Sequence, residues 1–362
     1  MARIELDLAH AYRANPQRDE DYALLPLKMC FEDGGAYALL GPSGCGKTTL
    51  LNLVSGLVTP SQGNVKYDGR DVTRLSPQQR NIAQVFQFPV IYDTMTVAEN
   101  LAFPLRNRGV PADRIQQRVA QVAEMLDMSG QLGMRAAGLA ADAKQKISLG
   151  RGLVREDVSA VLFDEPLTVI DPHLKWQLRR KLKQIHHELK LTLIYVTHDQ
   201  VEALTFAQQV VVMTRGKAVQ IGTASELFER PRHTFVGNFI GSPGMNFLGA
   251  RGDGQGIEVA GRRHAAPNAA LAALPAFTLG VRPEHVQVVA PDSAGAVPGV
   301  ITQAQDIGTY WLVTARVGTG RDESLLRARL GAEQLIPRVG ETAWLSVVGA
   351  STCYYLNEEL IA

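Results

Sequence analysis

The chain has 362 residues, and its 37 Lys and Arg are balanced by 36 Asp and Glu. This length predicts about two or three domains, each with room for a buried core. The charge balance argues against nucleic acid as the main partner, because phosphate binding needs a surplus of basic residues on one surface. The cysteines Cys30, Cys45 and Cys353 form no paired or metal-type spacing, which favours a reducing compartment.

No segment of the sequence resembles a leader or a membrane span. Residues 1–22 lack the apolar core of a signal peptide. No apolar stretch reaches the length that crosses a bilayer. If the chain works at a membrane, we expect other chains to hold it there.

Short apolar runs that alternate with amphipathic patterns predict an α/β domain with a parallel sheet covered on both faces. The predicted strands are Ala36 to Leu40, Val158 to Phe163, Leu191 to Val196 and Val210 to Met213. Helical spacing of apolar residues follows Lys47 and recurs at 115–126 and 174–189.

Two regions depart from this alternation. Residues from about 90 to 151 are rich in helical patterns and predict an inserted helical subdomain. After Gly241, turn residues and short, regularly spaced apolar runs predict a small β-barrel or sandwich. We therefore expect an α/β domain over 1–240 and a β domain over 241–362.

A phosphate-binding loop follows the first predicted strand. Its residues, Gly41-Pro42-Ser43-Gly44-Cys45-Gly46-Lys47-Thr48, fit the pattern G-x-x-x-x-G-K-[ST] between a strand and a helix. Glycines let the backbone N–H groups surround phosphate oxygens, and the helix adds its positive end. We expect Lys47 to reach the β- and γ-phosphates of ATP, the Thr48 hydroxyl to ligate Mg²⁺, and Thr49 to complete the binding loop.

A second pair of candidates lies where the strand at 158–163 ends. Asp164 and Glu165 come directly after it, at the carboxyl edge of the predicted sheet, where ligands of α/β folds bind. We expect Asp164 to hold Mg²⁺ and Glu165 to activate the attacking water. A solvated acidic turn is the alternative reading, and the upstream phosphate loop weighs against it.

With these motifs, the sequence resembles the ABC transporter ATPases over nearly its whole length. Val85-Phe86-Gln87 is similar to the Q-loop of that family, Leu162 to Pro166 to its strand-and-carboxylate motif, and Tyr195 to Asp199 to its switch-histidine motif. The resemblance implies a RecA-like P-loop domain in which His198 contacts the γ-phosphate. It also implies that Gln87 joins Thr48 and Asp164 at the metal and links that site to a transmembrane partner. Tyr12 lies where the family places an adenine-stacking aromatic ring, and Tyr22 is a second candidate.

Within the family, the second half is similar to ATPases of bacterial carbohydrate importers, above all those of glycerol importers. The matching segments are Asp199 to Ala203, Gly241 to Phe247 and Gly280 to His285. The resemblance implies an OB-type accessory domain at the C-terminus and a peripheral position on the cytoplasmic face of the bacterial inner membrane. It further implies a second ATPase subunit, two transmembrane permeases and, indirectly, an extracytoplasmic solute-binding protein. The implied cargo is a small polyol or carbohydrate, with glycerol favoured.

The family signature, L-S-G-G-Q, is altered here to Leu139-Ala140-Ala141-Asp142-Ala143. In the family dimer, this segment faces the γ-phosphate of the ATP held by the other subunit. Ala140 has no hydroxyl, and Asp142 brings a negative charge toward an anion. At about 5 Å and an effective dielectric constant of about 20, the repulsion is about 3 kcal/mol per unit charge. The D-loop, Thr168-Val169-Ile170-Asp171, departs as well.

These departures predict an ATPase heterodimer in which a partner supplies the intact signature. A homodimer that tolerates the altered signature is the alternative. A second alternative is a regulatory subunit that binds ATP without hydrolysing it, against which Glu165 and His198 both argue.

Overall fold

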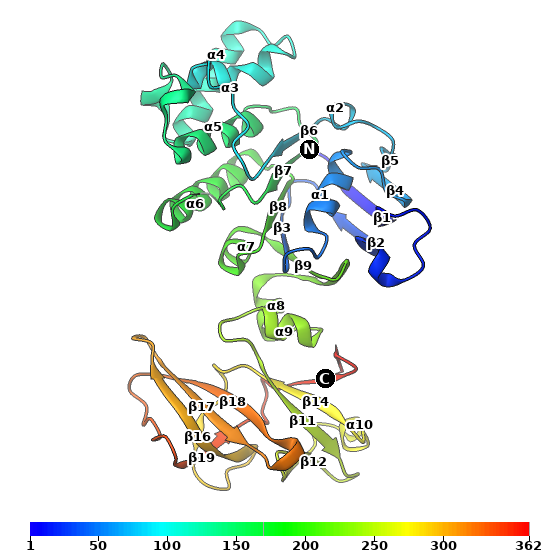
Figure 1. Ribbon diagram of the computed structural model, residues 1–362, viewed down its shortest axis with the longest axis vertical. Coiled ribbons are helices and arrows are strands. Elements are labelled where there is room, and N and C mark those ends of the chain that lie inside the picture. The colour runs from blue at the N-terminus through cyan, green and yellow to red at the C-terminus, as the bar shows by residue number, and fades with distance from the viewer. Residues whose placement is uncertain (169, 362) are drawn as a thin grey trace. The chain divides into compact units, whose positions relative to one another are not determined.

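The computed structural model describes residues 1–168 and 170–361, so Val169 of the altered D-loop lies outside the described residues. The chain forms two compact units, Met1–Ala224 and Ser225–Ala362. Each is described by itself (Figure 1).

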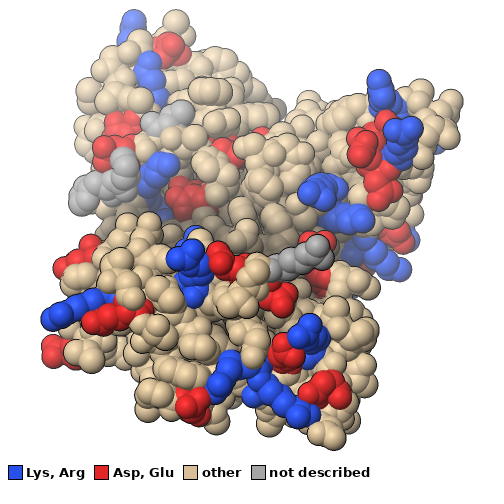
Figure 2. Space-filling view, turned by 60° about the horizontal axis from the view of Figure 1, so that its bottom comes forward, with Lys and Arg blue, Asp and Glu red and all other residues tan. Residues whose placement is uncertain are grey.

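Charged side chains of both signs are interspersed on the face that Figure 2 shows. Surface ion pairs of the N-terminal unit include Arg3 with Glu32 and Lys181 with Asp127.

A six-stranded sheet forms the centre of the N-terminal unit, in the order β10-β9-β3-β8-β7-β6. The pairs among β9, β3, β8, β7 and β6 are parallel, and β10 is antiparallel to β9. All residues of β3 and β8 are buried, as expected for strands covered on both faces. The strands are β3 (Ala36–Leu40), β6 (Ile82–Val85), β7 (Ala160–Asp164), β8 (Leu193–Thr197), β9 (Gln209–Thr214) and β10 (Lys217–Gly222). The accompanying helices are α1 (Lys47–Ser55), α2 (Pro77–Arg80), α6 (Pro172–Leu189) and α7 (Gln200–Phe206).

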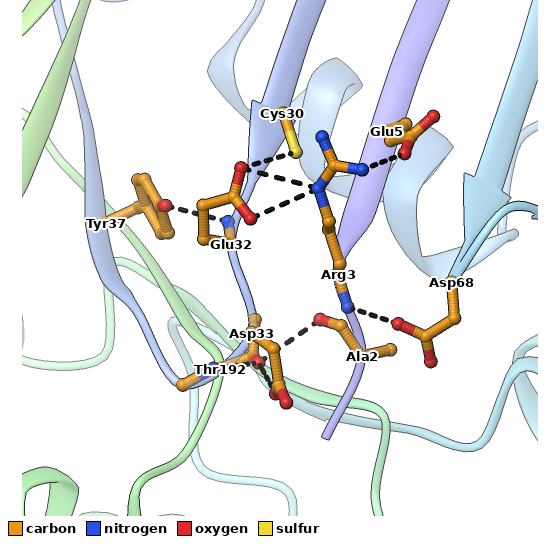
Figure 3. A network of polar contacts seen from close by, with 10 residues as sticks. Ala2, Arg3, Glu5, Cys30, Glu32, Asp33, Tyr37, Asp68 and Thr192 are labelled. Carbon is orange, nitrogen blue, oxygen red and sulfur yellow. Dashed lines mark hydrogen bonds and ion pairs between the residues drawn. The ribbon is translucent and has the colours of Figure 1, made fainter.

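An antiparallel sheet, β2-β1-β4-β5, lies beside α1 (Figure 1). Its strands are β1 (Ile4–His10), β2 (Leu24–Phe31), β4 (Gln62–Tyr67) and β5 (Arg70–Asp71). Polar contacts hold the first strand in place (Figure 3): Arg3 donates to Glu32 at 3.1 Å, and its backbone N–H donates to Asp68 at 2.8 Å. The connection from β1 to β2 contains the short 3₁₀ helix η1 (Asp19–Asp21).

Helices α3 (Val97–Arg106), α4 (Ala112–Met125) and α5 (Ala141–Leu153) make up the inserted subdomain, together with the 3₁₀ turns η2 (Ser129–Gln131) and η3 (Ala136–Gly138). The sequence starts α3 with a capping box, in which Thr96 and Glu99 bond each other's backbone N–H groups. Leu101, Val122 and Ile147, one from each helix, are fully buried in the same cluster. The helices therefore share one apolar core.

The C-terminal unit contains two antiparallel sheets, β13-β12-β11-β14-β20-β21 and β15-β19-β16-β17-β18. Buried and exposed residues alternate along β18, where Leu326, Ala328 and Leu330 are buried and the residues between them are exposed. The elements of the first sheet are β11 (Asn246–Gly252), β12 (Ile257–Val259), β13 (Arg262–His264), β14 (Phe277–Val281), β20 (Cys353–Leu356) and β21 (Glu359–Leu360). Those of the second are β15 (Val288–Val289), β16 (Ala296–Asp306), β17 (Trp311–Val317), β18 (Ser324–Leu330) and β19 (Thr342–Ser346). The short helices are α8 (Ala224–Glu229), α9 (Thr234–Phe239), α10 (Ala269–Ala272) and η4 (Gly320–Asp322).

The division between the units differs from the boundary expected after residue 240. Arg282, only 1% exposed, donates to the carbonyl oxygens of Phe228 at 2.9 Å and Gly237 at 3.0 Å. These carbonyls belong to α8 and α9, whose C-terminal carbonyls need partners outside the helix. A side chain of the β domain therefore supplies those partners, and both helices belong by contact to the C-terminal unit.

Candidate functional site

The phosphate-binding loop joins β3 to α1. Gly44 and Gly46 adopt left-handed backbone angles, with φ of 77° and 103°. At Gly46, a Cβ atom would lie 2.6 Å from the carbonyl oxygen of Ala23, so only glycine fits. Gly46 is also the N-cap of α1, which places the free N–H groups of the helix at the loop. The loop thus has the backbone that a phosphate cradle requires.

Lys47 lies inside this loop. It is 6% exposed, and its Nζ donates to the carbonyl oxygens of Gly41 at 2.9 Å and Pro42 at 3.0 Å. The Cys45 thiol lies 3.9 Å from the same nitrogen, and burial raises the pKa of that thiol. Cys45 therefore packs as a neutral, small side chain under the loop.

Thr48 and Asp164 meet at the carboxyl edge of the parallel sheet. The Thr48 hydroxyl donates to Asp164 Oδ1 at 3.3 Å. A hydroxyl and a carboxylate are the hard oxygen ligands that Mg²⁺ prefers, with substrate phosphates and water filling its remaining positions. The residues therefore fit a nucleotide-bound Mg²⁺. Among the described residues, no group of three or more His, Cys, Asp or Glu could hold a metal without such a substrate.

Burial of Asp164 disfavours its ionised carboxylate in the nucleotide-free protein. Burial and, secondarily, the neighbouring Glu165 raise its pKa, although the Thr48 bond and Lys47 oppose that rise. A raised carboxyl pKa means that folding favours the protonated form, so stability falls as pH rises from the unfolded pKa through the folded one. At pH 7, the ionised carboxylate therefore costs stability, which bound Mg²⁺ would compensate.

We expect Asp164→Asn to raise the melting temperature of the nucleotide-free chain at pH 7 by a few degrees, because it removes this buried charge. The gain should shrink at pH values below the usual carboxyl pKa. The same variant should lose Mg²⁺-dependent ATP turnover. Thermal unfolding at several pH values, with and without Mg²⁺ and ATP, checks both effects. An unchanged or lower melting temperature at pH 7 would contradict the electrostatic argument.

Glu165 and His198 also lie together at this edge. His198 Nδ1 is 3.0 Å from Glu165 Oε2, and the Thr168 hydroxyl donates to the same oxygen at 3.2 Å. Glu165 has a left-handed φ of 48°, a conformation that costs a non-glycine residue about 1 kcal/mol or more. Its backbone N–H donates to the carbonyl of Val196 on β8 at 3.0 Å, which holds this turn in place. The turn thus directs the Glu165 carboxylate toward the histidine.

Thr168 is a contact that the sequence reading missed. The family pattern marks Thr168 only as part of the altered D-loop, but its position three residues after Glu165 is a signal of this contact. A hydroxyl donor at this distance along a turn can reach back to the carboxylate.

Tyr12 is 67% exposed, and its hydroxyl lies 3.1 Å from the Thr49 hydroxyl of α1. Its ring meets His10 edge-on, with 4.6 Å between ring centroids. His10 is buried, which lowers its pKa and keeps it neutral at pH 7. Tyr12 therefore presents an open aromatic face beside the phosphate loop. Tyr22 lies at the other end of the loop between β1 and β2, where its hydroxyl accepts a hydrogen bond from Gln62.

We expect Tyr12→Ala to raise the KM for ATP about three- to tenfold with little change in kcat, because an aromatic stacking contact contributes about 0.5–1.5 kcal/mol. Tyr22→Ala is the matched control and should leave both constants within twofold of wild type. Initial-rate ATP titrations give the two parameters. Equal effects of the two substitutions would contradict the assignment of Tyr12.

Gln87 lies two residues beyond β6, which pairs with β7 through Val85 and Phe163. It therefore belongs to the same sheet edge as Asp164. No contact from its side chain to Thr48 or Asp164 is found among the described residues, so its role at the metal stays a prediction. The residues around it are apolar and exposed, namely Phe86, Phe88, Val90 and Tyr92.

The altered signature forms the start of α5. Ala140 is the N-cap, with extended backbone angles, and it has no side-chain oxygen to accept from the helix N–H groups. Asp142 lies in the first turn, where a negative charge stabilises the positive helix end. Asp142 also lines a cavity of about 320 Å³ together with Lys146 and residues of α6. The helix end that would attract a phosphate in the family thus carries its own anion.

Comparisons with known proteins agree with this geometry. A family model described as "ABC transporter" matches residues 24–168, and one described as "TOBE domain" matches residues 279–353. The chain is 41% identical to the sn-glycerol-3-phosphate import ATP-binding protein UgpC of Escherichia coli (strain K12), over 88% of this chain and 89% of that one. The protein of the same name from Salmonella choleraesuis (strain SC-B67) is 40% identical over the same shares.

Among solved structures, the chain is similar to cbiO1 from Clostridium perfringens, part of the ABC transporter complex cbiONQ. The TM-score is 0.56 at 25% sequence identity, covering 63% of this chain and 90% of that one. These matches confirm the predicted fold class, an α/β nucleotide-binding domain followed by a β-rich domain.

Proposed function

The chain belongs to the ATP-binding subunits of ABC transporters and is an ATPase, and from this premise we propose that it powers the import of a small polyol or carbohydrate. The observation that carries the proposal is the identity of 41% over 88% of the chain with proteins named as import subunits. Such a match spans both units, so the likeness is not confined to the ATPase motifs.

Residues at the carboxyl edge of the parallel sheet have separate roles in ATP hydrolysis in this proposal. The loop from Gly41 to Thr49 binds the phosphates, and Tyr12 stacks on adenine. Thr48 and Asp164 hold Mg²⁺, which supplies charge neutralisation when it is bound with the nucleotide. Glu165 takes the proton of the attacking water, and His198 orients that carboxylate and contacts the γ-phosphate. The 3.0 Å distance between Glu165 and His198 supports this assignment.

The exposed apolar surface around Gln87 fits the partners that the family resemblance implies. In the part of the chain that the structure describes, no helix is long and apolar enough to cross a membrane. The exposed apolar residues near Gln87 offer a docking surface for two permease subunits that do cross it. Arg151 supports this surface, with its guanidinium 4.7 Å from the Tyr92 ring centroid and a 2.7 Å bond to the Val90 carbonyl. The chain then works on the cytoplasmic face of the bacterial inner membrane, with a solute-binding protein on the other side.

The cargo is glycerol or a close derivative. The relatives named above import sn-glycerol 3-phosphate, and the sequence motifs favour glycerol itself. An ATPase subunit makes no contact with cargo, so the preference for glycerol rests on the similarity of these motifs to glycerol importers and not on a cargo-binding residue.

The second ATPase subunit of the complex is a different chain in this proposal. Ala140 lacks the capping oxygen, and Asp142 opposes an incoming phosphate, whereas Lys47, Thr48, Asp164, Glu165 and His198 are all in place. A partner with an intact signature would complete the site at this chain's phosphate loop. The comparisons do not support the heterodimer, and they do not support a subunit that binds ATP without hydrolysing it.

Purification of the tagged chain from detergent-solubilised membranes tests the proposal. We expect two permeases to copurify and a second, distinct ATPase chain to be present. In proteoliposomes with the solute-binding protein, glycerol or sn-glycerol 3-phosphate should stimulate ATP turnover, and a complex carrying Glu165→Gln in this chain is the control. Turnover that responds to no polyol or carbohydrate would contradict the import proposal, and a complex with two copies of this chain would contradict the heterodimer.

A further inference from the structure

A buried carboxylate on α7 lies near the residue assigned above as the switch histidine. Glu202 is 4% exposed, and its Oε2 accepts hydrogen bonds from the Tyr195 hydroxyl at 2.9 Å and the Thr197 hydroxyl at 2.8 Å. Its other oxygen lies 3.8 Å from Lys175 Nζ on α6. A buried carboxylate needs hydrogen bonds or an ion pair, and here one oxygen accepts two hydrogen bonds while the other faces the Lys175 ammonium group.

This network encloses the backbone of His198 from both sides. The Thr197 hydroxyl donates to Glu202 and accepts from the Asp199 N–H at 3.0 Å. The Asp199 carboxylate in turn caps α7, accepting from the N–H groups of Val201 at 2.7 Å and Glu202 at 3.1 Å. The residues before and after His198 are therefore both fixed by the same set of bonds.

The network also reaches the segment that follows the D-loop. Lys175 lies in the first turn of α6, and its N–H donates to the carbonyl of Asp171 at 2.9 Å. The remaining donor, Tyr195, is fully buried in β8, and burial together with the Glu202 carboxylate raises its pKa. The tyrosine thus stays protonated and keeps donating. Lys175 and Glu202 connect the start of α6 to the turn that carries His198.

We propose that Glu202 and Thr197 are positioning residues for ATP hydrolysis, which hold His198 in the direction that meets Glu165. Neither residue touches the nucleotide; both act through the histidine. The inference rests on the roles proposed above for Glu165 and His198. A loosened turn would let the His198 ring leave the 3.0 Å contact, while the phosphate loop and Tyr12, on other elements, would bind ATP as before.

Thr197→Val is the sharpest test, because valine keeps the shape of the side chain and removes only the bridging hydroxyl. In the assembled transporter, with the substitution in this chain alone, we expect kcat to fall about tenfold while KM for ATP stays within twofold. Thr197→Ser retains the hydroxyl and should keep at least half of the wild-type kcat. Glu202→Met keeps a side chain of similar length, removes both acceptor oxygens and should reproduce the kcat loss, which secures the test if the valine variant folds poorly.

Thr192→Val is the matched control at the other end of β8. Thr192 is fully buried, and its hydroxyl bonds Ala2 and Asp33 (Figure 3). It also accepts from the Gly34 N–H, and it lies five residues before the end of β8 that carries Thr197. It should lower the melting temperature about as much as Thr197→Val without the loss in kcat. Wild-type kcat in Thr197→Val, or equal kcat losses in the two valine variants, would overturn the inference. If His198→Ala turned over ATP at the wild-type rate, the proposed role of His198 would be wrong, and this inference with it. If His198→Ala lost turnover while the Thr197 and Glu202 variants kept the wild-type kcat, only the positioning roles would be overturned.

Discussion

Glu165→Gln should reduce ATP turnover at least about a hundredfold, because a positioned general base contributes about 10²- to 10⁴-fold to such a step. The substitution keeps the shape of the side chain, and an amide oxygen can still accept from Thr168. It removes the basic oxygen that lies 3.0 Å from His198. ATP binding should persist, since Glu165 belongs neither to the phosphate loop nor to the aromatic face that Tyr12 offers to adenine. Measurement of steady-state turnover beside equilibrium binding of a fluorescent ATP analogue separates the two effects.

Lys47→Ala is the matched control for this prediction, because it affects the same site through binding. Its Nζ is the buried cation of the phosphate loop, so its loss should abolish tight nucleotide binding and turnover together. The two variants therefore have opposite binding signatures with the same turnover defect. Wild-type turnover in Glu165→Gln would remove Glu165 from the role of base.

The parts of the site that depend on local pattern were predictable from the sequence. A strand, a glycine loop and a helix in succession define the phosphate cradle within a few neighbouring residues. Glu165 and His198 each follow a strand of the parallel sheet, and parallel strands place their carboxyl ends at one edge, so their meeting could be expected. The comparisons confirm the family and fold class that these motifs indicated.

Features that depend on contacts distant in sequence could not be predicted in the same way. The boundary between the units follows from Arg282, which reaches carbonyls more than forty residues earlier in the chain. The bond between Tyr12 and Thr49 joins a loop to a helix, and no periodicity encodes it. The left-handed backbone of Glu165, which directs its carboxylate, leaves no trace in a pattern of apolar residues. Such features arise from tertiary packing.

Restoring the signature should raise ATP turnover by this chain alone about ten- to a hundredfold. The variant combines Ala140→Ser, Ala141→Gly and Asp142→Gly, and is assayed at concentrations high enough for two copies to pair. Removal of a charge repulsion of about 3 kcal/mol corresponds to about a hundredfold in rate if it is fully felt in the closed site. The new serine supplies the missing hydroxyl, and the glycines remove two Cβ atoms.

The same substitutions should lower the stability of the folded chain, because the altered sequence suits the start of a helix. Asp142 stabilises the start of α5 by about 0.3–1 kcal/mol, and each glycine costs a helix about 1 kcal/mol relative to alanine. A serine cap returns about 1 kcal/mol, so the restored chain should melt only a few degrees lower than wild type.

Asp142→Asn is the matched control for the turnover prediction, because it removes the charge and keeps the size of the side chain. It should recover part of the gain in ATP turnover. If wild-type chain alone already turns over ATP as fast as the restored variant, with Glu165→Gln as the blank, the altered signature closes a working site and the ATPase pair is a homodimer. A large gain would instead mean that, in the wild-type complex, the missing signature comes from a second ATPase chain.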